Sequence, residues 1–136
     1  MTTERYDNMV HIAESEWMIM KVLWAESPLS SRQIIDHLEG QTDWNDKTVH
    51  TLISRLCKKG AILAEKPKGS NFYQYSANVN EKECMLFETK NFLKRLYSGS
   101  LTGMVSAFVE GNGVSQKDIR QLRKLLEQYE KENKND

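Results

Sequence analysis

The segment from Asn45 to Gly60 constrains the fold of this chain most strongly, because both of its ends carry helix-boundary residues. Asn45 and Asp46 are typical N-terminal caps, and the negative charge of Asp46 suits the positive end of a helix dipole. Lys58 and Lys59 place cations in the last turn, and Gly60 follows as a stop. The apolar residues between them recur at i, i+3, i+4, i+7 and i+8, which predicts a helix over 45–59 with one buried face. They are Val49, Leu52, Ile53, Leu56 and Cys57.

Two shorter amphipathic segments precede this helix. The first covers residues 15–26 and ends before Pro28, since proline does not continue a helix. The second begins at Ser30 or Ser31, both of which are good caps, and ends at Gly40. Their apolar residues follow helical spacing, so each helix is expected to bury one face. These residues are Trp17, Ile19, Met20, Leu23 and Trp24 in the first segment, and Ile34, Ile35 and Leu38 in the second.

A β-hairpin is predicted directly after Gly60. Residues 61–66 have the composition of a strand, residues 67–71 that of a turn, and residues 72–76 that of an aromatic-rich returning strand. Three helices followed by a hairpin are the elements of a winged helix-turn-helix. The predicted fold class is therefore mainly α with a small β-hairpin: a winged helix-turn-helix followed by C-terminal helices.

Three further amphipathic segments make up the rest of the chain. They cover residues 81–97, residues 101–109, and a last helix that starts at a capping box formed by Ser115 and Asp118. Because each is short and apolar on one side only, the stripes need a partner surface. We expect a second copy of the chain rather than the winged domain, since most soluble homo-oligomers are two-fold dimers. The residues expected at this dimer interface are Phe92, Leu96, Leu101, Met104, Val105, Phe108, Val109, Ile119, Leu122 and Leu126.

A chain of 136 residues and 15.8 kDa has room for one winged domain of ordinary size and a helical appendage. The expected division is a flexible lead-in over residues 1–11, a winged helix-turn-helix domain over 12–78, a dimerisation segment over 79–130 and a frayed tail over 131–136. His11 falls in the lead-in, and His37 is expected on a helix surface.

The formal net charge is zero, but the charges are distributed unevenly along the chain. Residues 1–44 carry three basic and eight acidic side chains, and residues 69–136 carry ten basic and nine acidic ones. Residues 45–68 carry six basic side chains against two acidic ones, a local charge of +4. The field that a polyanion meets is local, so the 45–68 segment is the expected DNA-binding surface.

The polar side of the 45–59 helix carries the residue types that DNA recognition requires. Short hydroxyls, a histidine and cations can reach base edges and phosphates in a major groove. His50 and Thr51 are the base-reading candidates with Lys47 and Thr48 beside them, and Ser54 lies on the same side. Arg55 and Lys58 are expected to hold phosphates. An ordinary solvated helix face is the alternative to this interpretation.

Residues 66–72, which are the turn of the hairpin and one residue on each side of it, are called the wing below. Lys68 and Ser70 are the wing residues expected to contact the sugar-phosphate backbone or an adjacent minor groove. The aromatic residues Phe72, Tyr73 and Tyr75 are expected to pack within the protein, and stacking on bases is the alternative.

The sequence argues against several classes of protein. No apolar run approaches the roughly 20 residues of a membrane span, and the polar first nine residues lack the apolar stretch of a signal peptide, so the protein is expected in the cytoplasm. No serine, cysteine or histidine arrangement suggests catalysis, so neither an enzyme nor a cofactor is expected. Cys57 and Cys84 lie outside metal-binding spacings, and no metal site is expected. A site that folding assembles from both cysteines and a histidine is the alternative.

The residues also resemble a known family. Glu16-Trp17, the run from Trp44 to Gly60 and the stretch from Phe72 to Tyr75 are similar to the penicillinase and methicillin-resistance repressor family, which includes the CopY-type copper repressors. Weaker similarity covers residues 90–92 and 108–110. The pattern Trp-x-x-Lys-Thr-Val-x-Thr-Leu-x-x-Arg-Leu-x-Lys-Lys-Gly is the most specific part of the resemblance.

The resemblance implies a homodimeric winged-helix repressor that binds double-stranded operator DNA at an inverted repeat related to TACA and TGTA. Antibiotic-responsive members are cleaved at a position that corresponds to Ala107-Phe108, where this chain has alanine in place of asparagine. Copper-responsive members use paired Cys-x-Cys motifs, which this sequence lacks. The inducing signal and any protease are left unspecified. A winged-helix module for protein docking and a metal-responsive repressor with an atypical sensor site remain alternatives.

Overall fold

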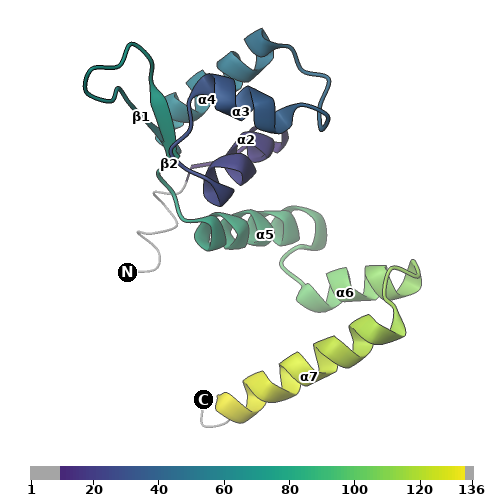
Figure 1. Cartoon of the computed structure of the whole chain (residues 1–136). Coiled ribbons are helices and arrows are strands. Elements are labelled where there is room, and N and C mark those ends of the chain that lie inside the picture. Colours follow the sequence, from purple (N-terminus) through teal and green to yellow (C-terminus); the bar gives the residue numbers. More distant parts are fainter. Residues whose placement is uncertain (1–9, 134–136) are drawn as a thin grey trace. The chain divides into compact units, whose positions relative to one another are not determined.

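A computed structural model of the chain describes residues 10–133. Within that range it contains six helices and one two-stranded sheet (Figure 1). In chain order the elements are α2 (Glu14–Ala25), α3 (Ser31–Leu38), α4 (Asp46–Lys59), β1 (Ile62–Glu65), β2 (Gln74–Ala77), α5 (Glu81–Tyr97), α6 (Leu101–Glu110) and α7 (Gln116–Glu132). This confirms the predicted fold class, a mainly α chain with a small hairpin after its third helix.

Local capping explains where most of these helices begin. The Ser30 hydroxyl accepts a hydrogen bond from the backbone N–H of Gln33, whose side chain accepts in return from the N–H of Ser30, so α3 starts with a capping box. Ser115 and Asp118 form the predicted capping box of α7. These reciprocal bonds satisfy N–H groups that a first helical turn leaves unpaired.

The hairpin is antiparallel and tied to the helices at its base. Ile62 pairs with Ala77, and Glu65 pairs with Gln74 nearest the turn. Leu29, in the connection between α2 and α3, forms an isolated antiparallel bridge with Tyr75 through bonds of 3.0 and 2.7 Å between their backbone N–H and C=O groups. The returning strand begins at Gln74 and not at the expected position 72, because Gln74 pairs with Glu65, the last residue of β1.

The core of the winged part joins all three of its helices, β1 and the first half of α5. Its buried apolar side chains are Ile12, Ile19, Met20, Leu23, Leu29, Ile34, Leu38, Val49, Leu52, Ile53, Leu56, Ala61, Ile62 and Cys84. Val10 packs against the same cluster and Ile12 belongs to it. Val10, which falls in the lead-in expected over 1–11, therefore contacts the core, and residues 1–9 lie outside the described part of the chain.

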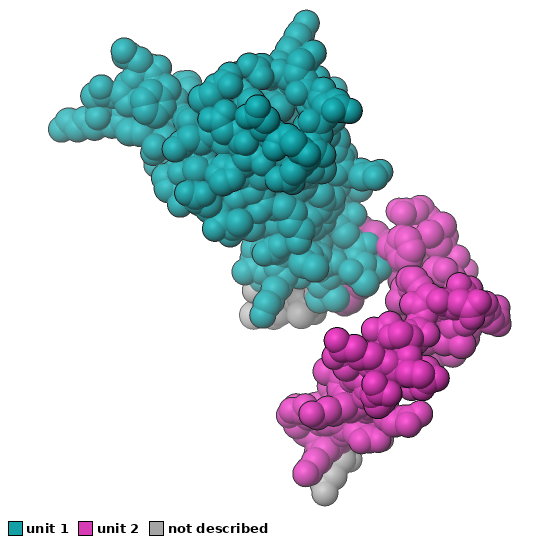
Figure 2. Space-filling model, turned by 45° about the vertical axis from the view of Figure 1, so that its right-hand side comes forward, with its two compact units in different colours: residues 1–89 teal, residues 90–136 magenta. Residues whose placement is uncertain are grey.

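The chain divides into two compact units, residues 1–89 and residues 90–136 (Figure 2). The division falls inside α5 and not at residue 79, because Cys84 is buried in the core of the first unit. In the second unit, α6 and α7 have no buried residue. Helix α7 continues to Glu132, so Lys131 and Glu132 are helical although the sequence analysis assigned them to a frayed tail. Residues 134–136 of that tail are outside the described range.

Candidate nucleic-acid interface

Helix α4 has the boundaries that its sequence predicted. The side-chain oxygen of Asn45 accepts hydrogen bonds from the backbone N–H of Thr48 at 2.8 Å and from its hydroxyl at 3.0 Å. At the other end, Gly60 adopts φ +81°, a left-handed conformation that glycine enters without steric cost. Val49, Leu52, Ile53 and Leu56 are buried as expected, whereas Cys57 at the edge of this face is only half-buried.

The opposite face of α4 carries the predicted DNA-contacting residues on the surface. Lys47, His50, Thr51, Ser54, Arg55 and Lys58 are exposed, and Thr48 is half-buried. Two of the hydroxyls are already engaged inside the helix: Thr48 bonds to its cap, and Thr51 donates to the carbonyl of Lys47 at 3.0 Å. A hydroxyl that donates within the helix still has lone pairs to accept a hydrogen bond, for example from the amino group of a base.

The N-terminus of α4 is tied to α3 by an ion pair that the sequence pattern did not predict. A guanidinium nitrogen of Arg32 lies 2.8 Å from a carboxylate oxygen of Asp46, and another lies 3.7 Å from Asp36. The hydrogen bond to Asp46 and its charge are the main causes that raise the pKa of Arg32. Arg32 therefore neutralises the acidic residue that lies closest to the expected base-reading positions.

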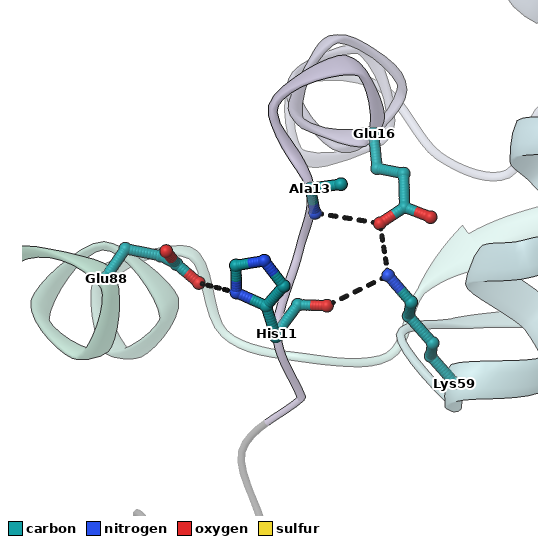
Figure 3. Close-up of polar contacts among 5 residues, drawn as sticks. All are labelled: His11, Ala13, Glu16, Lys59 and Glu88. Atoms are coloured by element: carbon teal, nitrogen blue, oxygen red, sulfur yellow. Dashed lines mark hydrogen bonds and ion pairs between the residues drawn. The ribbon is translucent and has the colours of Figure 1, made fainter. Parts of the chain in front are cut away.

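The C-terminus of α4 is held by a polar network around a buried carboxylate (Figure 3). The ammonium of Lys59 forms a short ion pair with Glu16 of α2 and donates to the carbonyl of His11 at 3.0 Å. Glu16 is only 1% exposed and also accepts from the N–H of Ala13 at 2.8 Å. The imidazole Nδ1 of His11 lies 3.2 Å from Glu88 on α5.

The electrostatic balance at Glu16 favours its charged form. Burial by itself raises the pKa of this carboxyl, but the hydrogen bonds from Lys59 and Ala13 and the charges of Lys59 and Arg55 outweigh it. The pKa of Glu16 therefore lies below its ordinary value of 4.5. The network therefore fixes the C-terminal end of α4 in the winged unit, and the ion pair between Arg32 and Asp46 fixes its N-terminal end.

The wing projects from the helices between β1 and β2 (Figure 1). The N–H of Ser70 bonds to the carbonyl of Pro67 at 2.9 Å, and Gly69 between them adopts φ +80°, as the third residue of a type II turn requires. Lys68 is exposed, whereas the hydroxyl of Ser70 accepts from the N–H of Phe72 at 3.1 Å and donates to its carbonyl at 3.2 Å. Ser70 thus shapes the turn.

The expected packing of Phe72, Tyr73 and Tyr75 is correct only for Tyr75. Tyr75 packs against the core cluster, and burial raises the pKa of its phenol. Phe72 and Tyr73 are 55% and 51% exposed, so the prediction that they pack inside the protein was wrong. Both precede the first paired residue of β2, Gln74, and therefore lie beyond the part of the hairpin that covers the core.

Both cysteines are free thiols, Cys57 half-buried and Cys84 buried. Burial raises the pKa of the Cys57 thiol, and burial followed by the charges of Glu83 and Glu88 raises that of Cys84. Between residues 10 and 133 there is no group of three or more histidine, cysteine, aspartate or glutamate side chains arranged to hold a metal ion. Over the same residues, no helix has the length and apolar character to cross a membrane.

The second unit exposes an apolar surface that includes the predicted dimer residues. Met104 and Ile119 are half-buried, and the other eight predicted residues are exposed. Leu125 and Tyr129 are exposed on α7 as well, and Leu125, three residues after Leu122, was not among the predicted dimer residues. A groove of about 500 Å³ between α6 and α7 is lined mainly by Val105, Val109, Val114, Ile119, Leu122 and Leu126. The Ala107-Phe108 bond lies inside α6.

Known proteins resemble the chain over most of its length. The sequence profile of a family described as Penicillinase repressor matches residues 12–128. The methicillin resistance regulatory protein MecI of Staphylococcus aureus (strain N315) is 36% identical over 121 residues, 88% of this chain and 97% of that protein. The penicillinase repressor of Bacillus licheniformis is 32% identical over 123 residues, 90% of this chain and 94% of that protein.

A solved structure is similar to about half of the chain. The solution structure of monomeric BlaI from Bacillus licheniformis, in complex with the blaP half-operator, has a TM-score of 0.47 and 31% identity, and the match covers 54% of this chain and 88% of that chain. By its family profile and its relatives, the chain belongs to the penicillinase repressor family, whose members are DNA-binding transcriptional repressors and not enzymes.

Proposed function

We propose that this protein represses transcription by binding, as a homodimer, to an inverted-repeat operator with TACA-like and TGTA-like half-sites. The observation that carries the proposal is the exposed face of α4, where the cations Lys47, Arg55 and Lys58 surround His50 and Thr51 on a helix fixed at both ends. A rigid helix of this kind presents its N-terminal residues to base edges in a major groove. Family membership supports the same conclusion.

In this proposal, different residues of α4 contact the bases and the phosphates of a half-site. His50 and Thr51, in the first half of the helix, read base edges, whereas Arg55 and Lys58 contact phosphates further along the groove. Lys68 in the wing adds a phosphate contact. A phosphate contact contributes to affinity at every sequence, while the base contacts select the operator.

The second unit supports the homodimer. Its helices α6 and α7 have no buried residue, yet they expose Leu101, Phe108, Leu122 and Leu126. A patch of contiguous large apolar side chains marks an interaction surface in a soluble protein. Pairing two copies there would cover this surface and link two α4 helices, so that the second half-site is bound at a high effective concentration.

A salt titration of binding to a duplex with two half-sites tests the proposal. We expect log K to fall linearly with log salt, because bound cations displace counterions from the phosphates. Arg55→Ala and Lys58→Ala should each reduce the slope by about 1, and His50→Ala should weaken operator binding while leaving binding to unrelated DNA unchanged. Lys117→Ala, an exposed lysine on α7, is the matched control.

The dimer is tested separately by mass. Light scattering should give twice the 15.8 kDa of one chain, and Phe108→Asp should give one chain and lose the preference for two half-sites over one. Salt-independent binding that Arg55→Ala leaves unchanged would contradict DNA recognition by α4. Capture of an acidic protein by a chain that ignores operator DNA would instead favour a protein-docking module.

A further inference from the structure

Phe72 and Tyr73, called the aromatic pair below, are not accounted for by the packing of the protein. Both are more than half exposed, although the hairpin that carries them buries Ile62 and packs Tyr75 and Ala77 against the core. Scattered apolar residues are normal on a protein surface. Two adjacent aromatic rings at the end of a projecting turn, next to cations, are a more specific arrangement.

We propose that the aromatic pair packs against deoxyribose faces at the edge of the minor groove beside the half-site, and so supplies a part of the affinity that does not depend on salt. The inference rests on the proposed function and extends it, since the wing residues assigned above contribute only through charge and hydrogen bonds. Apolar side chains are a recurrent means of contact with the minor groove.

The wing holds the aromatic pair in place before DNA arrives. The type II turn from Pro67 to Ser70 and the two bonds between the Ser70 hydroxyl and the backbone of Phe72 fix the chain that leads into the pair. The ammonium of Lys66 lies 5.6 Å from the ring centroid of Tyr73. A cation over a ring face is attracted to it, which restrains both side chains. An ordered contact loses less conformational entropy on binding than a mobile one.

The charge around the aromatic pair identifies DNA as its occupant. Lys66 precedes the turn and Lys68 lies within it, and both belong to the 45–68 segment with its charge of +4. An apolar patch that is bordered by cations matches a surface on which apolar sugars alternate with phosphates. A second copy of the chain is less suited to this place, because a symmetric contact between two wings would bring the same lysines together.

The test measures affinity, salt slope and sugar protection on one operator duplex with the full-length protein. Phe72→Ala/Tyr73→Ala should lower affinity about tenfold while the slope of log K against log salt stays that of the wild type. Lys68→Ala should instead reduce the slope by about 1. Hydroxyl-radical footprinting should show that the aromatic double variant loses protection of the deoxyriboses flanking the half-site and keeps protection elsewhere.

Two controls separate contact from structure. Leu63→Ala removes an apolar side chain that is 46% exposed on β1 of the same hairpin, and it should bind as the wild type does. Phe72→Tyr/Tyr73→Phe keeps both rings and should restore affinity and protection, which would exclude a folding defect as the cause. Wild-type affinity in the alanine double variant, a changed salt slope, or unchanged sugar protection would overturn the inference. Failure of the wild-type protein to bind the duplex would overturn the proposed function as well.

Discussion

Replacing Lys59 with methionine tests whether the end of α4 is held by a buried charge pair. The substitution keeps a long side chain but removes the cation that faces Glu16, a carboxylate that is only 1% exposed. Removing one partner of a buried pair costs about 3–5 kcal/mol, because the remaining charge stays desolvated. The side chain of Lys59 is 32% exposed and the N–H of Ala13 still bonds to Glu16, so water and this bond reduce the expected loss to about 2–3 kcal/mol.

The measurement is thermal unfolding of the full chain, monitored by tryptophan fluorescence. The chain has three tryptophans, Trp17, Trp24 and Trp44, and all lie in the first unit, so the signal reports the winged unit alone. For a unit of this size, 1 kcal/mol corresponds to about 4–8 °C, and Lys59→Met should lower the midpoint by about 10–20 °C. Lys58→Met is the matched control, since Lys58 is the exposed neighbour and its loss should change stability by less than about 0.5 kcal/mol.

The stability difference between the wild type and Lys59→Met should also depend on pH in a definite direction. In the wild type the pKa of folded Glu16 is lowered, so its stabilising contribution is complete above 4.5 and is lost as the pH falls through the folded pKa. In Lys59→Met the largest remaining influence is burial, which raises the pKa and makes the charged form destabilising. The stability gap between the two proteins should therefore begin to narrow above 4.5, where the Glu16 carboxyl of the variant takes up a proton, and narrow further below 4.5, where the wild type loses its own contribution.

A second substitution removes the negative charge of Glu16, which Lys59→Met leaves buried without its cation. Glu16→Gln in the Lys59→Met background keeps an oxygen for the N–H of Ala13 without the negative charge, and it should recover about 1–2 kcal/mol. A gap that does not change with pH, or a double variant no more stable than Lys59→Met, would refute the reasoning that desolvation of Glu16 causes the loss.

Three further substitutions probe how α4 and its surroundings are held, and each is checked by urea unfolding at neutral pH. Asn45→Ala removes the cap on Thr48 and should cost about 1 kcal/mol, whereas an unchanged midpoint would show that the cap is dispensable. Leu56→Ala empties a fully buried position and should cost about 2–5 kcal/mol, more than the same change at exposed Leu63. Trp24→Phe deletes the indole N–H that donates to Val79 at 2.9 Å and should cost about 1–2 kcal/mol, and a loss below about 0.5 kcal/mol would contradict that role.

The elements that the sequence predicted well are those with local boundary signals. Helix α4 begins after Asn45 and ends at Gly60, and its buried face follows from spacing alone. Helix α5 likewise has its predicted bounds, residues 81–97. Capping and helical periodicity act between residues a few positions apart, so a single sequence contains the information that they use.

The features that the sequence did not reveal depend on contacts between distant segments. Glu16 has the pattern of an exposed acid in a first helical turn, and only the approach of Lys59 from α4 makes it a buried partner. The bridge between Leu29 and Tyr75 ties the hairpin to the connection between α2 and α3, and no residue near Tyr75 signals it. The pair between Arg32 and Asp46 requires the crossing of α3 and α4. These contacts are set by packing geometry, which local pattern does not encode.

The two units differ in whether their apolar residues are buried within one chain, and this difference links stability to function. The winged unit has a buried core of its own, so α4 is held in position within one chain. Helices α6 and α7 bury no residue within one chain, so the proposed dimer would supply their core. On that basis, the protein concentration at which dimerisation covers the apolar surface of α6 and α7 is also the concentration at which two α4 helices are joined. A substitution that weakens the α6 and α7 surface would then lower operator affinity without altering any residue that contacts DNA.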